Sequence, residues 1–281
     1  MQIRHSSVLL CPPTYFTVRD VKNPFMNPER AIDGTRALEQ WEALRAAFAT
    51  AGVETHAVDA VEDLEDMVFA ANQTYVGSGS AHARFAVPSS MRYASRRREV
   101  PYFARWFADH GFDVLDLELD VEADEYLEGN GDLLQHPGDA HVWAGFGFRS
   151  TPAGVARFSA AMAGENVGVT PLELADPNFY HLDTCFAPLN SEAALVYSPA
   201  FTQDALSALR RGWRRLHEVD RDDALHFACN GIAVNGYFIV AHPSEAIVEA
   251  VRREGLVPLV VDTSEFEKGG GSVFCMKTFL D

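Results

Sequence analysis

Hydrophobic residues recur at helical spacing in five separate segments of the chain. In the first segment, residues 33–51, the side chains at this spacing are Leu38, Trp41, Leu44 and Phe48. The other four segments cover about 95–111, 151–164, from 202 to beyond 213, and 244–255. Their apolar positions are Phe103, Trp106 and Phe107; Val155, Phe158 and Met162; Leu206, Leu209, Trp213 and Leu216; and Ile247, Val248 and Val251. The pattern predicts five amphipathic helices, most of which end near a glycine.

A short β-prone run follows each predicted helix, and a polar motif follows each run. The runs are 53–58, 113–117, 167–174, 214–219 and 256–261. The motifs are 66–72, 128–132, 181–183, 229–231 and the glycine-rich segment 269–275. In the last four cases the distance from the helix start to the motif is similar, about 30 residues. The chain therefore reads as five copies of one supersecondary unit.

Five copies of one unit predict a closed radial array, in which equivalent loops converge on the central axis. The five polar motifs would then meet in space although they are far apart in the sequence. The alternative left open by the pattern is an ordinary α/β sheet with helices on its faces. No linker or domain boundary is visible, so the sequence predicts one domain, residues 1–281, made of five repeats.

Composition and charge narrow the function classes. The chain has 281 residues, of which 47% are hydrophobic, and this is enough for a large core. Its net charge of −17 argues against binding to nucleic acid or to an anionic membrane. The charge suits a cationic ligand, or simply a solvated acidic surface. No apolar run is long enough to span a membrane and no signal peptide is evident, so we predict a cytoplasmic protein.

The four cysteines are scattered singly, which fits neither a zinc site nor a disulfide framework. Cys11, Cys185 and Cys229 lie in apolar stretches and are interpreted as buried thiols. Cys275 differs, because three glycines precede it and glycine lets the backbone pass close to a ligand. Cys275 is therefore a candidate nucleophile, with a buried apolar thiol as the alternative.

A histidine and several acids could complete a covalent site around Cys275. His181 could move protons, and Asp66, Glu128 and Asp183 could hold a cation. A guanidinium suits such acids, because its N–H groups point in fixed directions that carboxylates match. Each acid could instead cap a turn or face solvent, and His181 could be a structural histidine.

Taken together, the motifs resemble those of the guanidino-group-modifying enzymes. This superfamily includes arginine deiminase, dimethylargininase, arginine dihydrolase and glycine amidinotransferase. The resemblance spans nearly the whole chain and is carried by segments 11–13, 23–26, 66–72, 128–132, 179–184 and 269–275. It implies a five-bladed α/β propeller of ββαβ repeats, the pentein fold, which agrees with the repeated unit found in the chain.

The resemblance also implies roles for individual residues. Cys275 matches the nucleophile and His181 the general acid/base, and Glu128 is grouped with them as catalytic. Asp66, Glu128 and Asp183 match positions that hold the guanidinium, and Arg96 and Arg149 match arginines that bind the substrate α-carboxylate. Neither a metal nor an organic cofactor is implied.

Two departures from the dimethylargininase pattern bear on the subclass. Those enzymes typically carry an acid where Asn72 stands and usually lack one at the position of Asp183. Asn23 and Asn72 resemble residues of the bacterial arginine dihydrolases, which convert arginine to ornithine, ammonia and carbon dioxide. We therefore expect a hydrolase that acts on arginine, ahead of dimethylarginine. Dimethylargininase, amidinotransferase and a non-catalytic arginine-binding protein are the alternatives, and the oligomeric state is open, with a homo-oligomer as one expectation.

Overall fold

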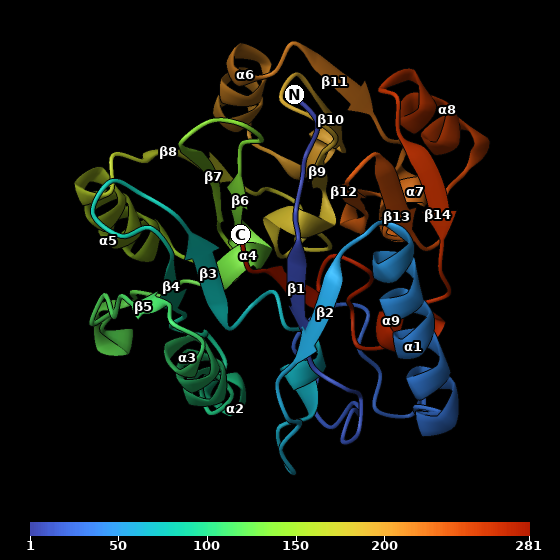
Figure 1. Ribbon diagram of the computed structural model, residues 1–281, viewed down its shortest axis with the longest axis horizontal. Coiled ribbons are helices and arrows are strands. Elements are labelled where there is room, and N and C mark those ends of the chain that lie inside the picture. Colours follow the sequence, from blue (N-terminus) through green and yellow to red (C-terminus); the bar gives the residue numbers. More distant parts are fainter.

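Five three-stranded sheets surround a common axis in the computed structural model, which describes residues 1–281 (Figure 1). In every sheet the middle strand pairs antiparallel with the inner strand and parallel with the outer strand. A helix joins each middle strand to its outer strand, since parallel neighbours need a crossover connection. The result is a five-bladed α/β propeller of ββαβ units, as predicted.

The first blade contains both ends of the chain. Its inner strand is β15 (Lys277–Phe279), its middle strand β1 (Ser7–Leu10) and its outer strand β2 (Glu54–Ala57), with helix α1 (Gly34–Thr50) as the crossover. Because β15 pairs with β1, the last residues of the chain close the ring that the first residues opened.

The other four blades each come from one continuous segment. The second contains β3 (Thr74–Gly77), β4 (Phe85–Pro88), α2 (Ala94–Arg97), α3 (Val100–Asp109) and β5 (Asp113–Val114). The third contains β6 (Leu133–Gln135), β7 (His141–Phe146), α5 (Pro152–Gly164) and β8 (Gly168–Glu173). The fourth contains β9 (Phe186–Pro188), β10 (Ala193–Val196), α6 (Gln203–Gly212) and β11 (Arg215–Glu218). The fifth contains β12 (Ile232–Val234), β13 (Tyr237–Val240), α8 (Glu245–Arg253) and β14 (Val257–Val260).

Short helical turns lead into the inner strands of the second to fifth blades. These turns are η1 (Glu65–Val68), α4 (Gly129–Asp132), η3 (Leu182–Thr184) and η5 (Ala228–Asn230). The remaining short helices are η2 (Val121–Ala123), η4 (Ser198–Ala200), α7 (Arg221–Leu225) and α9 (Ser264–Glu267). Each of the four turns overlaps one of the predicted polar motifs, so the motifs occupy equivalent positions at the start of the inner strands.

The predicted helices and outer strands are confirmed, with three corrections. The expected single helix at 95–111 is two helices, because Pro101 lacks the N–H that a continuing helix needs and instead lies in the first turn of α3. Helix α6 ends at Gly212, so Leu216 belongs to β11. Leu38 is 49% exposed, and Ala37 takes the buried position in line with Trp41.

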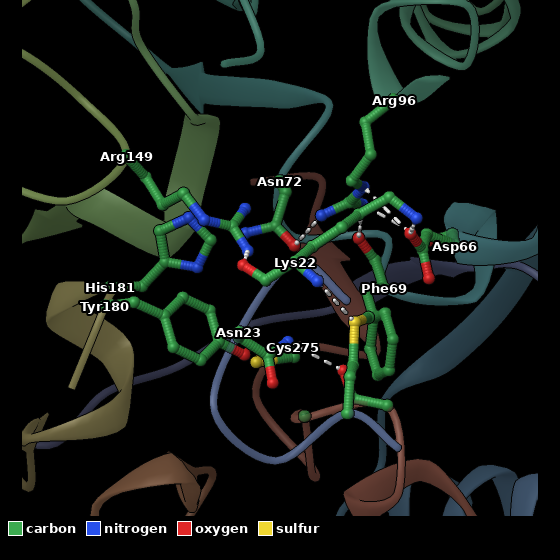
Figure 2. A pocket seen from close by; sticks show the side chains of 13 residues that line it. Lys22, Asn23, Asp66, Phe69, Asn72, Arg96, Arg149, Tyr180, His181 and Cys275 are labelled. Carbon is green, nitrogen blue, oxygen red and sulfur yellow. Dashed lines mark hydrogen bonds and ion pairs between the residues drawn. The ribbon is translucent and has the colours of Figure 1, made fainter. Parts of the chain in front are cut away.

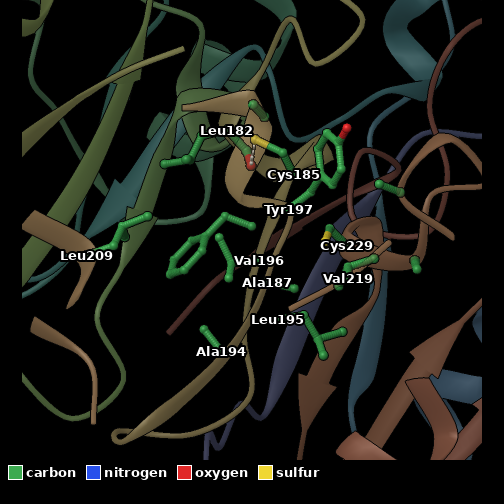
Figure 3. Packing of buried hydrophobic residues seen from close by; sticks show 14 of the residues in the cluster. Leu182, Cys185, Ala187, Ala194, Leu195, Val196, Tyr197, Leu209, Val219 and Cys229 are labelled. Atoms are coloured by element: carbon green, nitrogen blue, oxygen red, sulfur yellow. Dashed lines mark hydrogen bonds between the residues drawn. The ribbon is translucent and has the colours of Figure 1, made fainter. Parts of the chain in front are cut away.

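The largest apolar cluster lies between the third, fourth and fifth blades (Figure 3). It joins strand β10, through Leu195, to Leu182 and Cys185 at the start of β9 and to Cys229 next to β12. Cys11 is buried in a separate cluster, so all three cysteines expected to be buried thiols are buried. This packing fixes η3 and η5, the turns that carry two of the polar motifs. No helix combines the length and the apolar character that crossing a membrane requires.

Candidate active site

Seven of the predicted site residues line one cavity near the axis of the propeller (Figure 2). They are Asn23, Asp66, Asn72, Arg96, Arg149, His181 and Cys275. Glu128 and Asp183 are completely buried behind this lining and contact His181 and Cys275. Residues from four of the five motifs and from the 20–26 segment therefore converge, and Asn230 of the fifth motif contacts the sulfur of Cys275, as the radial repeat predicts.

The sulfur of Cys275 has two polar side chains as neighbours. Its S–H points at Asp183 Oδ2, 3.2 Å away, and Asn230 Nδ2 donates to the sulfur over 3.2 Å. Burial raises the pKa of this thiol well above its ordinary value, and the carboxylate of Asp183 raises it further. A cation placed beside the sulfur would oppose both effects, because an opposite charge favours the thiolate.

The glycines before Cys275 are required by close contacts. Gly270 has a φ of +85°, in the left-handed region that favours glycine, and a Cβ there would overlap the side chain of Asn23. A Cβ at Gly271 would overlap the ring of Phe69. The glycine-rich segment 269–275 thus passes close to the other cavity walls only because these positions lack side chains.

A chain of charged groups orients His181. Its Nε2 lies 2.7 Å from Glu128 Oε2, which also accepts a hydrogen bond from Arg149 over 2.9 Å. Burial alone would raise the pKa of Glu128, but Arg149 and His181 more than offset burial and hold it well below its ordinary value. The ionised Glu128 therefore fixes the orientation of the imidazole.

The guanidinium of Arg149 contacts two aromatic rings, a backbone carbonyl and the carboxylate of Glu128. The guanidinium lies over the rings of Tyr93 and Tyr180, at 4.7 Å and 4.8 Å from the ring centres, and its other end donates to the carbonyl of Lys22 over 2.9 Å. The hydroxyl of Tyr180 in turn donates to the carbonyl of Gly270. Arg149 therefore links the Glu128–His181 pair, the glycine-rich segment 269–275 and the 20–26 segment.

Asp66 and Arg96 lie close together at one end of the cavity. The Oδ2 atom of Asp66 is 3.0 Å from the ammonium of Lys22 and 3.9 Å from Arg96 Nε. Arg96 also donates to Asn72 Oδ1 over 3.1 Å and pairs with Glu99 at 3.1 Å. Burial would lower the pKa of Lys22, but Asp66 and Asp20 raise it above its ordinary value. The ammonium group of Lys22 is therefore already paired with Asp66, the carboxylate that the sequence assigned to a guanidinium.

Four buried polar atoms of the site residues have no hydrogen-bond partner. Two are the carboxylate oxygens of Asp66, which is ion-paired with Lys22. The other two are Asn72 Nδ2, which can only donate, and Asp183 Oδ1, which accepts. An unpaired buried group costs free energy, which a complementary ligand would recover. Asn72 and Asp183 suit a ligand that offers N–H groups to Asp183 and an oxygen to Asn72.

Three functional candidates escaped the sequence analysis: Lys22, Tyr180 and Asn230. A lysine is usually exposed, so nothing in the pattern around Lys22 indicates that only 4% of it is accessible. Asn230 lies inside a motif that the repeat marked, and Tyr180 directly precedes another, so their positions near the start of the inner strands were the available signal.

Asp183 makes the free protein sensitive to pH. Burial raises its pKa to about 7, against an ordinary value of 3.8. The folded state therefore holds this proton more tightly than the unfolded state, and the resulting stability is present at low pH and lost as the pH rises through 7. With about 1.4 kcal/mol for each pKa unit, the loss approaches roughly 4 kcal/mol by pH 8. Asp183→Asn should not lose this stability.

Urea unfolding at pH 5 and pH 8 would test this expectation. The free energy of unfolding of Asp183→Asn, relative to the wild type, should increase between the two values. Asp109→Asn, which changes an exposed acid on α3, should track the wild type. Parallel pH curves for the wild type and Asp183→Asn would contradict the raised pKa.

Comparison with known proteins places these residues in context. The sequence model of the family described as N,N dimethylarginine dimethylhydrolase, eukaryotic, matches residues 12–279. The bifunctional arginine dihydrolase/ornithine cyclodeaminase ArgZ of Synechocystis is 34% identical over 277 residues, which are 96% of this chain and 37% of ArgZ. The N(G),N(G)-dimethylarginine dimethylaminohydrolase of Mycobacterium tuberculosis is 32% identical over 266 residues, which are 95% of this chain and 83% of that enzyme.

Solved structures show the same architecture. The N-terminal domain of ArgZ, an arginine dihydrolase crystallised with its substrate, superposes with a TM-score of 0.89 at 31% identity and covers 98% of this chain and 97% of that domain. A dimethylarginine dimethylaminohydrolase in an adduct with S-methyl-L-thiocitrulline has a TM-score of 0.80 over 98% of this chain and 99% of that one. At 20% identity, that second likeness bears on the fold alone. The present chain spans little more than a third of the length of full ArgZ.

Proposed function

The chain belongs to the N,N-dimethylarginine dimethylhydrolase family, and on that premise we propose that it hydrolyses the guanidino group of arginine or a close analogue. Its substrate is a small molecule, and Cys275 forms the covalent intermediate. The observation that carries the proposal is the cavity in which Cys275 and His181 face the same space as Arg96 and Arg149. Residues 1–281 act as one catalytic domain, because both ends of the chain supply strands to the first blade.

The proposed reaction has two halves. The guanidinium, held by Asp183, lowers the pKa of the adjacent Cys275 thiol, and the thiolate attacks the guanidinium carbon. His181, protonated and paired with Glu128, gives its proton to the departing nitrogen, and ammonia leaves. A thiouronium adduct remains on Cys275. His181 then takes a proton from water, the water attacks the adduct, and citrulline and the free thiol are formed.

The opposite end of the cavity suits the head of an amino acid. The ammonium of Lys22 is paired with Asp66, close to Arg96. The α-ammonium group of a substrate would take the same place on Asp66, and the α-carboxylate of the substrate would bind Arg96 and Arg149. This differs from the guanidinium role that the resemblance implied for Asp66. The enclosed space measures about 10 Å³, room for roughly one water, so Lys22 and its neighbours must move before arginine enters.

The side chain of Asn72 favours arginine over dimethylarginine as the substrate, and it favours a second round of hydrolysis. A guanidinium carries no acceptor, whereas the ureido group of citrulline has an oxygen that could pair with the free Nδ2 of Asn72. If citrulline stays in the site, Cys275 would attack its ureido carbon, and hydrolysis with one more water would give ornithine, carbon dioxide and a second ammonia. ArgZ, named as an arginine dihydrolase, is a relative that fits this proposal.

Dimethylarginine is the second candidate substrate, favoured by the family description and by the name of the mycobacterial relative. Its methyl groups would lie against polar side chains, because Asp183 and Asn230 both lie 3.2 Å from the sulfur. Burying polar groups against methyl groups costs free energy. Arginine therefore ranks first.

Product analysis distinguishes these possibilities. The purified protein is incubated separately with arginine, dimethylarginine and citrulline, and ammonia, dimethylamine, citrulline and ornithine are quantified. We expect ammonia and ornithine from arginine. Dimethylamine as the main product would establish the second candidate, and consumption of added glycine or lysine would indicate amidino transfer. No turnover of any of them would contradict the proposal.

Asn72→Asp should change the end product. A carboxylate at this position favours a cationic guanidinium over a neutral ureido group, so the variant should release citrulline and form less ornithine. The ratio of ornithine to citrulline, measured by chromatography, should fall at least about tenfold, which corresponds to one hydrogen bond to a charged group. Asn235→Asp, outside the cavity, is the control. An unchanged ratio in Asn72→Asp would argue against this role.

A further inference from the structure

Asn230 contacts residues 269–275, here called the nucleophile loop, with both ends of its side-chain amide. Its Nδ2 donates to Cys275 Sγ over 3.2 Å and to the carbonyl of Asp183 over 3.0 Å. Its Oδ1 accepts from the backbone N–H groups of Ser272, Phe274 and Cys275 over 3.1–3.2 Å. The residue is completely buried, and every polar atom of its side chain is engaged with the two segments that carry Cys275 and Asp183.

We propose that Asn230 is a positioning residue for the reaction: its oxygen holds the nucleophile loop and its N–H group stabilises the Cys275 thiolate. The inference rests on the proposed role of Cys275 as nucleophile. The two polar side chains on the sulfur act in opposite directions. Asp183 accepts a hydrogen bond from the S–H group and so favours the thiol. Asn230 donates a hydrogen bond to the sulfur and so favours the thiolate.

The surrounding charges do not replace this donor. Asp183 on η3 and Lys277 on β15 face Cys275, and burial lowers the pKa of Lys277 to about 7, so this lysine carries only part of a charge near neutral pH. The other ionisable side chains that line the same cavity are Lys22, Asp66, Arg96, Arg149, Tyr180 and His181. Among the side chains of the protein, Asn230 is the one that donates a hydrogen bond to the sulfur.

The fold fixes the turn that delivers Asn230. Phe227, immediately before η5, has a φ of +61°, a left-handed conformation that is costly for a bulky residue and persists only where packing imposes it. Its carbonyl accepts the backbone N–H of Asn230 over 2.9 Å. Its ring packs against Phe25 with centres 4.9 Å apart. The amide of Asn230 is thus held in place by its own backbone and does not depend on a ligand.

Asn230→Asp separates the two roles, because an aspartate keeps the oxygen that collects three backbone N–H groups and, when ionised, lacks the donor to sulfur. The pH dependence of Cys275 alkylation by iodoacetamide should shift upward by about one unit or more, equivalent to a tenfold smaller thiolate fraction. The value of kcat should fall at least about tenfold at neutral pH and recover at higher pH, with a smaller change in KM. Alkylation needs no substrate, so this result stands apart from the substrate assay.

Asn235→Asp is the matched control, since Asn235 also ties two segments together, through His5 and Ala51, but lies outside the cavity. A purely structural role would lower the melting temperature in both variants and leave the alkylation midpoint unchanged. An unchanged midpoint in folded Asn230→Asp would overturn the proposal.

If Asn230→Asp does not fold, the wild-type protein provides the test. The side-chain amide resonances of Asn230, followed by ¹⁵N NMR, should titrate with the midpoint of Cys275 alkylation, and this titration should vanish in Cys275→Ala. Resonances that do not respond to ionisation of the sulfur would overturn the proposal.

Discussion

Cys275→Ser is expected to lose turnover of arginine by several orders of magnitude while arginine still binds. A serine hydroxyl keeps nearly the shape of the thiol but ionises far less readily, and its neighbour Asp183 disfavours a second negative charge. The groups that would hold the substrate, Arg96 and Arg149, are unchanged. Initial rates of ammonia release, together with calorimetric titration of arginine, separate the loss of chemistry from the loss of binding.

Cys11→Ser is the matched control for this prediction. Cys11 is also buried, and its S–H points at the carbonyl of Pro12, which a hydroxyl can equally reach. This variant should keep its turnover. Near-normal rates in Cys275→Ser, or an equal loss in Cys11→Ser, would remove Cys275 from the role of nucleophile.

The repeated order of helix, strand and motif predicted a closed radial array but left an ordinary α/β sheet open, and the resemblance to the guanidino-group-modifying enzymes pointed to the five-bladed propeller. Helices such as α8 show a clear apolar face, because one side packs on the sheet and the other faces solvent. The inner and middle strands gave no comparable signal. They are only three to six residues long, and strands such as β10 are buried along their whole length, so no alternation of apolar and polar residues marks them.

The sequence could predict which residues meet but not how they pair. It grouped Asp66 with Asp183 as grips for one cation, yet Asp66 lies with Lys22 and Arg96 while Asp183 lies against the sulfur. Both acids sit in equivalent motifs, and only the tertiary arrangement assigns each to one end of the cavity. A buried lysine such as Lys22 leaves no trace in composition or periodicity, since its burial depends on partners far along the chain.

His181→Ala is expected to lower turnover by about 10³-fold or more, because general acid–base catalysis contributes to both halves of the proposed reaction. The departing nitrogen would leave without a proton, and water would attack the adduct without a base. A haloamidine probe should still label Cys275 in this variant, since a halide leaves without needing a proton. Ammonia release and intact-mass measurement of the labelled protein would therefore give opposite results for the same variant.

His136→Ala is the control that makes this contrast decisive. His136 is also partly buried and hydrogen-bonded, to the carbonyl of Ser191 and to Trp143, but it lies outside the cavity. It should keep both turnover and labelling. If His181→Ala loses labelling together with turnover while remaining folded, His181 acts by shaping the site around Cys275. If it keeps its turnover, the proton must pass through another group, and the pairing of His181 with Glu128 would then serve the fold alone.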